Sequence, residues 1–349
     1  MANINYEYLS DINLNDPFFD SLRVDYQEFN SWFIRKSQEE ESAFTFYVDG
    51  LLNSFLYLKF EEESHHDINP PMPLNHRLKI GTLKIDAHGT KLGERFIKKI
   101  FDLATENNIN EIYVTVFAKH IGLISLFTTF GFYFYGVKST LNGDESVYVK
   151  RFNNIRDDIL LDFPMVKFSG VNKHVLSIYP KFHSKLFPDS ILNNESYSLL
   201  NDISPTNSIH KMYICAMSGV TNFRGGDIVL IYRTSDGLGL AKYRSVVTSV
   251  CTIQEVKNMY DFNDINEYLQ YCEPYSIFSE QELRSFFNTK KYPFIIKMVY
   301  NLAFKKRVIN DYLANSLMIR PSYWGVFSIS NDQFLNICRK GEINENLIY

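Results

Sequence analysis

The segment from 85 to 96, IDAHGTKLGERF, constrains the fold of this chain more than any other stretch. Before it, apolar residues alternate as in a strand, at Leu78, Ile80, Leu83 and Ile85. After it, apolar residues recur at helical spacing up to about residue 108. A helix that begins here points its free amides and the positive end of its dipole at the loop. The sequence therefore predicts an anion site, such as one for a pyrophosphate; tight packing of Gly89 and Gly93 at a helix entry is the alternative.

The surrounding stretches predict a mixed sheet with helices. Two helical segments near the N-terminus precede strands at 43–48 and 51–60, which the turn Asp49-Gly50 joins. Residues 61–73 are acidic and rich in proline, which indicates a loop. Further elements are expected after the central helix: a buried strand at 112–117, a helix at 121–130, and a strand pair at 132–137 and 146–152.

Two motifs in this order resemble those of the GNAT N-acetyltransferases. The loop is similar to the family's pyrophosphate loop, R/Q-x-x-G-x-G/A, with His88 at the first position, Gly93 at the last and Lys91 in place of the middle glycine. Residues 120–132, HIGLISLFTTFGF, resemble the second signature, N-x-x-A-x-x-L-Y-x-x-x-G-F. Leu126, Gly131 and Phe132 are in register, whereas the Asn, Ala and Tyr are replaced by His120, Leu123 and Phe127. The resemblance covers residues 77–152.

The resemblance implies that the chain binds acetyl-coenzyme A (acetyl-CoA) between two splayed strands. The pantetheine arm would pair with the backbone of Leu83, Lys84 and Ile85. The loop and the first helical turn would hold the pyrophosphate, and the second signature would contribute two further contacts. The cofactor-binding residues expected in these regions are His88, Gly89, Thr90, Lys91, Leu92, Gly93, Glu94, His120 and Phe127.

In such an enzyme an amine attacks the thioester directly, so the site removes a proton from the amine and supplies one to the thiolate. Phe127 cannot replace the phenol that often donates this proton in the family. We therefore expect either Tyr133 or Tyr135 to take over, or water; both tyrosines are otherwise ordinary strand residues. Asp86 and His88 are the candidate bases. An acceptor of low basicity, such as an aminoacyl ester, needs no strong base.

The rest of the chain predicts a second domain. Residues 153–210 contain four prolines without a clear period and are interpreted as a connector with some structure. From 211 to 349, several short strands and glycine turns resemble the PUA-like group of domains, which includes ASCH and EVE modules. The expected fold class is therefore α+β: a GNAT-type mixed sheet with helices at 1–152, followed by a PUA-like small β-barrel domain with helices.

Domains of the PUA-like group commonly bind RNA or modified bases. Charged residues for phosphate and a ring for stacking are available here, at Arg224, Arg233, Lys242, Arg244, Lys305, Lys306, Arg307 and Trp324. The alternative is a solvated basic face with Trp324 in the core. The net charge of −4 is unevenly spread: acidic residues are in excess up to residue 150 and basic residues after it.

Composition excludes several classes of protein. A chain of 349 residues with 45% hydrophobic residues can form two cores. We expect a cytoplasmic protein, because the N-terminus lacks the pattern of a secretory signal and no stretch reaches the roughly 18 apolar residues of a membrane span. The four cysteines are widely spaced, which indicates free buried thiols and no zinc site. His65 and His66 are interpreted as part of a solvated acidic turn, so no metal is expected.

These observations favour an acetyl-CoA-dependent N-acetyltransferase that acts on an amine of an RNA-associated substrate. Aminoacyl-tRNA is one such substrate, and its acetylation resembles what the acetyltransferase toxins of toxin–antitoxin pairs do. An antitoxin or regulator protein would then be a partner, and a membrane would not. The alternative is a GNAT fold without catalytic activity that serves as a nucleic-acid-binding or regulatory module.

Overall fold

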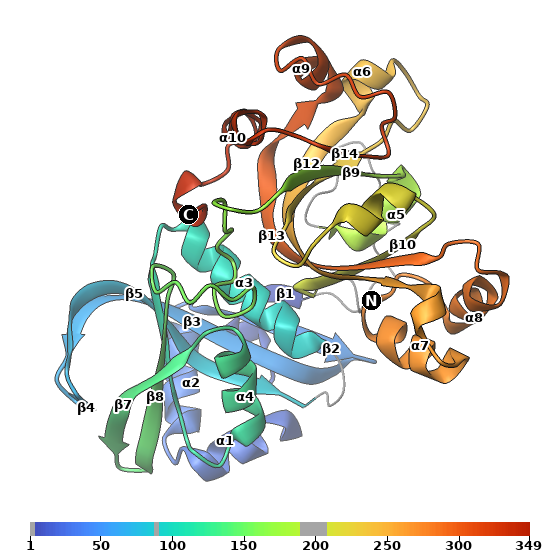
Figure 1. Cartoon of the computed structure of the whole chain (residues 1–349). Helices are drawn as coiled ribbons and strands as arrows, with labels where there is room; N and C mark the ends of the chain where they lie inside the picture. Colours follow the sequence, from blue (N-terminus) through green and yellow to red (C-terminus); the bar gives the residue numbers. More distant parts are fainter. Residues whose placement is uncertain (1–3, 87–90, 189–207) are drawn as a thin grey trace. The chain divides into compact units, whose positions relative to one another are not determined.

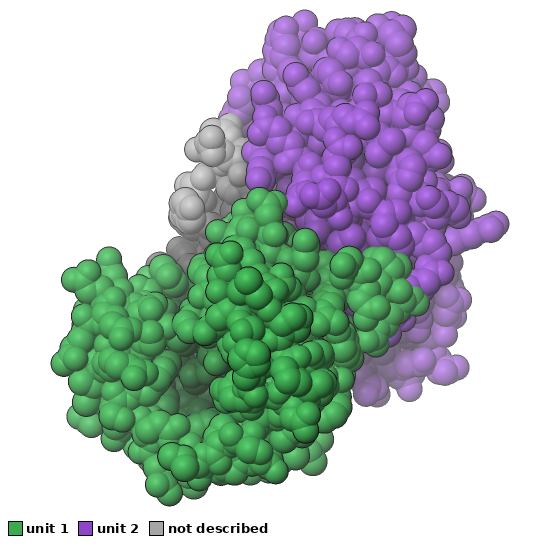
Figure 2. All heavy atoms as spheres, turned by 90° about the vertical axis from the view of Figure 1, so that its left-hand side faces the viewer, with its two compact units in different colours: residues 1–156 green, residues 157–349 purple. Residues whose placement is uncertain are grey.

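The computed structural model describes residues 4–86, 91–188 and 208–349. The chain divides into two compact units, unit 1 from Met1 to Arg156 and unit 2 from Asp157 to Tyr349 (Figures 1 and 2). Each unit contains its own sheet and its own core. Among the described residues, no helix is long and apolar enough to cross a membrane. All four cysteines are buried free thiols, as predicted.

Unit 1 contains an eight-stranded mixed sheet with the order β1-β2-β3-β5-β6-β8-β7-β4. Neighbouring strands are antiparallel except for β5 and β6, which run parallel. The strands are β1 (Ile4–Tyr8), β2 (Ser42–Val48), β3 (Leu51–His65), β4 (Ile68–Asn69), β5 (Met72–Ile85), β6 (Glu111–Val116), β7 (Tyr133–Thr140) and β8 (Gly143–Arg151).

Helices cover both faces of this sheet. The neighbouring residues Phe55 and Leu56 of β3 point to opposite faces, and both are fully buried. Phe55 packs against Phe19, Phe29 and Phe33, which come from the N-terminal helical region. In Figure 1, α1 (Asp20–Asp25) and α2 (Phe29–Gln38) lie on one side, and α3 (Leu92–Glu106) and α4 (Ile121–Thr129) lie on the other.

The two parallel strands of the sheet are paired at one end only. Residues 78–80 of β5 pair with 112–114 of β6, and the ladder between the two strands includes no residue of 81–85. Over the same length β5 remains paired with β3 on its other edge. The strands therefore part beyond Ile80, and half of the backbone groups of 82–85 face an opening in the sheet.

A buried ion network joins three strands at the closed end. The Glu111 carboxylate on β6 accepts hydrogen bonds from Arg77 on β5 and from Arg151 on β8, the latter at 2.5 Å. Arg77 is 1% exposed and also donates to the carbonyl oxygens of Glu63 (2.9 Å) and Pro73 (2.6 Å). Burial alone would raise the pKa of Glu111, but the two guanidinium groups hold it below its ordinary value.

Unit 2 contains a six-stranded sheet with the order β10-β13-β12-β11-β9-β14, in which only β9 and β11 run parallel. Alternate residues of β11 enter two separate cores: Ile228 and Leu230 pack on one face, and Val229 and Ile231 on the other. The strands are β9 (Lys173–Ile178), β10 (His210–Cys215), β11 (Ile228–Arg233), β12 (Val246–Asn258), β13 (Phe294–Ile309) and β14 (Val326–Ser328). The helices are α5 (Pro180–Leu186), α6 (Ala241–Arg244), α7 (Ile265–Cys272), α8 (Glu280–Thr289), α9 (Asn310–Asn315) and α10 (Asn331–Lys340).

The α+β class is confirmed, but several local expectations were wrong. Residues 61–73 are not a loop: β3 continues to His65 and β5 begins at Met72, because the acidic side chains there have cationic partners. The stretch expected as a connector contains β9, which pairs in parallel with β11. Among the described residues, the end strands β10 and β14 do not pair with each other, so the small barrel is not closed; β14 has only three residues.

The ion network predicts a large loss of stability when Glu111 is replaced. The substitution Glu111→Gln leaves Arg77 buried without its counter-ion, which should lower the free energy of unfolding by about 3 kcal/mol. Urea denaturation followed by circular dichroism measures this. The control Glu106→Gln, at an exposed position of α3, should stay within about 0.5 kcal/mol of the wild type. Equal effects of the two substitutions would contradict the role of the network.

Candidate functional site

A cavity of about 880 Å³ lies where β5 and β6 part. It is lined by residues 79–86 on one side and by 114–116 and 119–123 on the other. One end reaches Gly93 in the first turn of α3, and the other reaches the α1–α2 region and Glu145 on β8. The cavity thus connects a helix N-terminus with a polar chamber by way of the open edge of β5.

The first end is the N-terminus of a helix. Helix α3 has 15 residues and begins at Leu92. The backbone amides at a helix N-terminus and the positive end of the helix dipole face the helix entry, which suits an anion. A Cβ atom on Gly93 would lie 3.0 Å from Cδ2 of Leu126, so the glycine allows α3 to pack closely on α4.

Some of the predicted cofactor-binding residues line the cavity, and others do not. The cavity lining includes Leu83, Lys84, Ile85, Gly93 and His120. Leu92 and Phe127 are buried away from the lining, and Phe127 packs against Phe132 with ring centroids 5.0 Å apart. Lys91 and Glu94 form an ion pair at 3.4 Å, beside the first turn. His88, Gly89 and Thr90 lie outside the described residues.

The second end is enclosed by the short segment between α1 and α2. Asp25 pairs with Lys119 and with Nε2 of His120 at 2.9 Å, which joins the end of α1 to the start of α4. Glu28 accepts two hydrogen bonds from the amide nitrogen of Asn142, at 2.8 and 3.0 Å. The N-terminal helices are thereby tied to both the β6–α4 loop and the β7–β8 hairpin.

Tyr26 and Glu145 form a buried pair in this chamber. The Tyr26 hydroxyl donates to Oε1 of Glu145 at 2.7 Å, and Glu145 is 5% exposed. Burial, followed by the charge of Glu145, raises the pKa of Tyr26 far above its ordinary value, so the phenol stays protonated as the donor. Sequence reasoning missed both residues because they are 119 positions apart and neither lies in a motif.

The side chain of Lys79 lines the same chamber, and its positive charge is only partly stabilised there. Burial lowers the pKa of Lys79, and the Glu61 carboxylate, with Oε1 at 3.8 Å, offsets this effect only in part. Its Nζ lies 5.5 Å from the centroid of the Tyr113 ring. The neighbouring Lys138 forms an ion pair with Asp67 at 2.7 Å.

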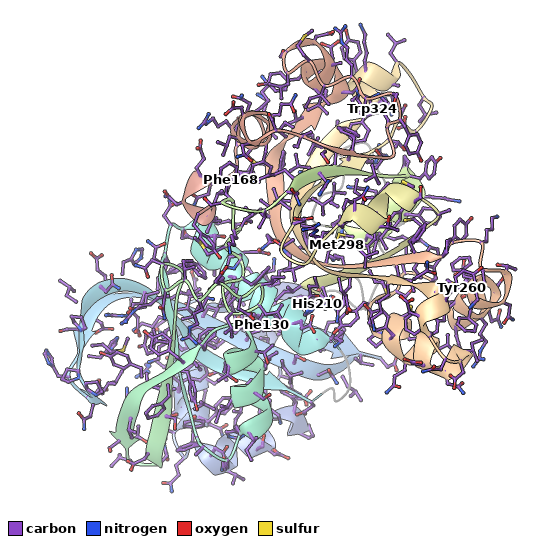
Figure 3. All side chains as sticks on the ribbon, in the orientation of Figure 1. Phe130, Phe168, His210, Tyr260, Met298 and Trp324 are labelled. Carbon is purple, nitrogen blue, oxygen red and sulfur yellow. The ribbon has the colours of Figure 1, made fainter. Side chains whose placement is uncertain are left out.

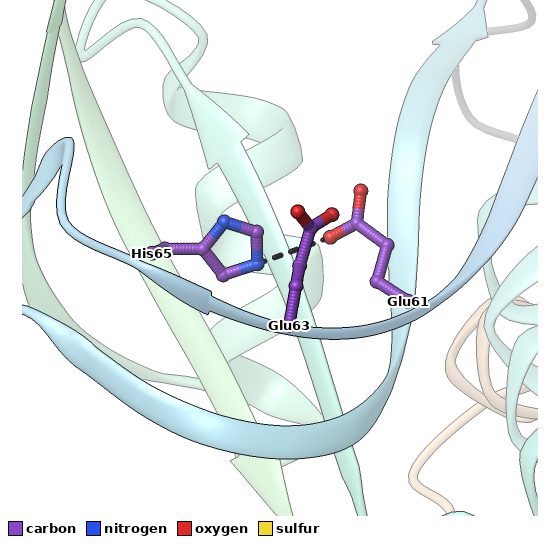
Figure 4. Close-up of side chains that lie close together, drawn as sticks. All are labelled: Glu61, Glu63 and His65. Carbon is purple, nitrogen blue, oxygen red and sulfur yellow. Dashed lines mark ion pairs between the residues drawn. The ribbon is translucent and has the colours of Figure 1, made fainter.

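Figure 4 shows the cluster of Glu61, Glu63 and His65, of which Glu61 contacts Lys79. His65 is 8% exposed and ends β3, so its interpretation as part of a solvated turn was wrong. The Glu61 carboxylate already has partners on both oxygens: Lys59 at 2.8 Å and Lys79 on one, Tyr113 and His65 on the other. Burial would raise the pKa of Glu61, but Lys59 and Lys79 hold it below its ordinary value. Because two lysines neutralise this carboxylate, the cluster is a poor metal site.

The predicted catalytic residues are not gathered at one point. Tyr133 and Tyr135 are absent from the cavity lining; the Tyr135 hydroxyl donates to the carbonyl of Pro71 at 3.0 Å, and Arg151 lies over both rings. Asp86 does line the cavity, but near the α3 end, where it is half exposed and pairs with Lys84 at 3.4 Å.

The candidate RNA-binding residues of unit 2 fall into two groups. Arg233 is 2% exposed, and Trp324 (Figure 3) is partly buried against the core, where it stacks on Tyr232 with ring centroids 5.2 Å apart. Arg244 is neutralised by two hydrogen bonds to Asp236, both at 2.5 Å. Arg307 is half-buried and donates to the carbonyl of Phe304. The exposed cations of the set are Arg224, Lys242, Lys305 and Lys306.

No family model and no curated protein sequence matches the chain. Solved structures that resemble it include an ASCH protein from Zymomonas mobilis, with 10% identity over 48% of this chain and 95% of that chain, at a TM-score of 0.32. An N-acetyltransferase from Staphylococcus aureus is 16% identical over 43% of this chain and 98% of its own, with a TM-score of 0.32. A GNAT-family acetyltransferase from Streptococcus pneumoniae is 11% identical over 43% and 99%, with a TM-score of 0.30.

The environment of Lys79 predicts unusual reactivity. Because its pKa is lowered, a larger fraction of its amine is neutral at a given pH than for an exposed lysine. Labelling with a small amine-reactive reagent between about pH 7 and 11, read by peptide mass spectrometry, should therefore give Lys79 a lower pH midpoint than Lys305. If the two labelling midpoints coincide, the groups around Lys79 offset the effect of burial on its pKa completely.

Proposed function

We propose that unit 1 is an acetyl-CoA-dependent N-acetyltransferase. The observation that carries this proposal is the parting of β5 and β6 beyond Ile80, which opens a cavity between a helix N-terminus and a buried polar chamber. A long, thin ligand with an anionic end and a reactive end fits such a cavity. Acetyl-CoA has this form, and it supplies the activated acetyl group.

The chain offers a matching group for each part of acetyl-CoA. The backbone of 82–85 is free on its β6 edge and would pair with the amides of the pantetheine arm. The N-terminus of α3, where Gly93 lines the cavity, would attract the pyrophosphate through the helix dipole. The thioester would then lie near Gly81, next to the chamber that contains Tyr26 and Glu145.

The identity of the acceptor is a further part of the proposal. The exposed cations of unit 2 support an RNA-associated substrate, because they can contact phosphates. Transfer to the amino group of an aminoacyl-tRNA would use both the acetyltransferase of unit 1 and the RNA contacts of unit 2. An antitoxin or regulator protein would then be a partner, and the cytoplasm would be the location. The competing proposal is a GNAT fold without activity, and the buried Phe127 favours it, because the position is not available as a proton donor.

Acetyl-CoA should raise the melting temperature of the protein. A ligand that binds only the folded state stabilises it by about 2.7 kcal/mol at a hundredfold excess over Kd. The substitution Gly93→Glu puts a bulky negative charge at the first turn of α3 and should abolish the shift. The control Lys99→Glu adds a negative charge further along the same helix and should keep it.

The outcomes separate the two proposals. A melting shift that persists in Gly93→Glu would show that the anion does not lie at α3, and the absence of a shift in the wild type would contradict acetyl-CoA binding. Turnover is then tested on a panel of amines that includes charged tRNA. Binding without turnover on any amine would favour the inactive module.

RNA binding should depend on the exposed lysines of β13. Because each phosphate contact releases counter-ions, affinity should fall as salt rises. The double substitution Lys305→Gln and Lys306→Gln should weaken binding and reduce the salt dependence by about two contacts. The control Arg244→Gln should have a smaller effect, because Asp236 already neutralises that charge. Filter binding at several salt concentrations measures this, and equal salt slopes in all three proteins would contradict contact at this strand.

A further inference from the structure

Glu145 differs from the other carboxylates that line the cavity. Asp25 is engaged by Lys119 and His120, and Glu28 by Asn142. Glu145 has one oxygen held by a neutral phenol, Tyr26. Among the described residues, the structure records no hydrogen bond to its other oxygen, Oε2, and the residue lines the cavity. A buried carboxylate with one oxygen fixed and one available can bind a cation from the cavity.

The charged groups around Glu145 come from each neighbouring element. Lys138 on β7 is its cross-strand partner but pairs with Asp67. Lys79 on β5 pairs with Glu61 on β3 and also interacts electrostatically with Glu145, and Tyr26 brings Asp25 and Glu28 into the vicinity. No lysine or arginine forms an ion pair with the Glu145 carboxylate within 4 Å among the described residues, so no contact ion pair competes with a ligand for it.

We infer that Glu145 binds the ammonium group of the acceptor and takes its proton, that Tyr26 positions this carboxylate, and that the acceptor is an alkylamine, protonated at neutral pH. This inference rests on the proposed acetyltransferase function and narrows its acceptor to an alkylamine, in place of the weakly basic aminoacyl ester considered there. An ionised carboxylate attracts an ammonium most strongly in a cavity with little water. A weakly basic amine, already neutral, has no need of such a group.

The proton balance follows from this arrangement. The ammonium transfers one proton to Glu145, and the freed nitrogen lone pair attacks the thioester carbon. The C–N bond forms, the C–S bond breaks, and the thiolate leaves with the electron pair. The nitrogen then loses its second excess proton, which ends on the thiolate, and Glu145 releases the first to solvent. The products are the N-acetylated amine, the free thiol and one proton.

Lys79 is the competing proton acceptor, since burial lowers its pKa. Its Nζ lies beside the Glu61 carboxylate and over the face of the Tyr113 ring, and both contacts favour the charged form. A charged Lys79 cannot accept a proton. The variant Lys79→Met separates the two assignments, because it removes this amine and leaves the Tyr26–Glu145 pair in place.

The test compares two acceptors in four proteins: the wild type and the variants Glu145→Gln, Lys79→Met and Asp144→Asn. The substitution Glu145→Gln should lower kcat/KM for an alkylamine at least about a hundredfold, the lower range for loss of a general base. The loss should be much smaller for a weakly basic amino-acid ester. The control Asp144→Asn, at the exposed neighbour on β8, should behave as the wild type. The melting shift caused by acetyl-CoA shows that each variant folds and still binds this substrate.

Each outcome decides one question. Equal losses with both amines, or a loss in Lys79→Met but not in Glu145→Gln, would overturn the assignment of Glu145. A wild-type protein that acetylates only the weakly basic amine keeps the proposed function and overturns the inferred acceptor class. A wild-type protein that does not bind acetyl-CoA contradicts the proposed function itself.

The role of Tyr26 is tested by a comparison of the two acceptors. The substitution Tyr26→Phe keeps the ring, which lies 5.3 Å from that of Phe117, and removes only the hydroxyl. Without this hydrogen bond the Glu145 carboxylate is no longer held in place, so kcat/KM should fall much more for the alkylamine than for the weakly basic ester. Equal losses with both acceptors would show that Tyr26 acts on folding or access and not on the carboxylate.

Discussion

The buried contact of Glu111 with Arg77 and Arg151 determines where the sheet of unit 1 is closed. The three residues come from β5, β6 and β8, and they lie next to the short ladder between 78–80 and 112–114. With the strands held at this end, the twist of the sheet separates them at the other. The cavity is a consequence of this fixed point, because its walls are the edges of β5 and β6 beyond the ladder.

A second set of polar contacts completes the cavity. The segment from Asp25 to Glu28 is bonded to residues of the β6–α4 loop and of the β7–β8 hairpin, far away in the sequence. Each of these contacts contributes little to stability, but together they place the N-terminal helices over the open end of the sheet. The same segment supplies Tyr26, so one short stretch both encloses the chamber and orients Glu145. The fold and the proposed chemistry therefore depend on the same residues.

Much of unit 1 could be predicted from local patterns. The strand before 86, the helix that follows the loop, the strand at 112–117 and the helix at 121–130 follow from apolar periodicity and glycine, and the structure confirms these four elements. The continuation of β3 to His65 could not be predicted, because Glu61 is stabilised by Lys79 of β5 as well as by Lys59 of its own strand, and the carbonyl of Glu63 accepts a hydrogen bond from Arg77 of β5. The pattern suggested a loop, because the sequence of one strand does not show which charged residues of the neighbouring strand will lie beside it.

The candidate site was less accessible to sequence reasoning than the fold. The positions 83–85 and Gly93, which the motifs single out, line the cavity, and their binding of the cofactor stays a prediction. Phe127 does not, because its helix turns that residue into the core. Tyr26 and Glu145 depend on the register of β8 and on the packing of the N-terminal helices, neither of which a single sequence reveals. In unit 2, β9 was missed because its parallel partner β11 lies about fifty residues away.

The central claim is that acetyl-CoA binds where β5 and β6 part, and hydrogen exchange tests it most directly. The account predicts that saturating acetyl-CoA slows amide exchange in peptides that cover 82–86, 114–116 and the first turn of α3, and leaves exchange in β12 and β13 unchanged. Unchanged exchange in these three segments, or protection confined to unit 2, would contradict the account.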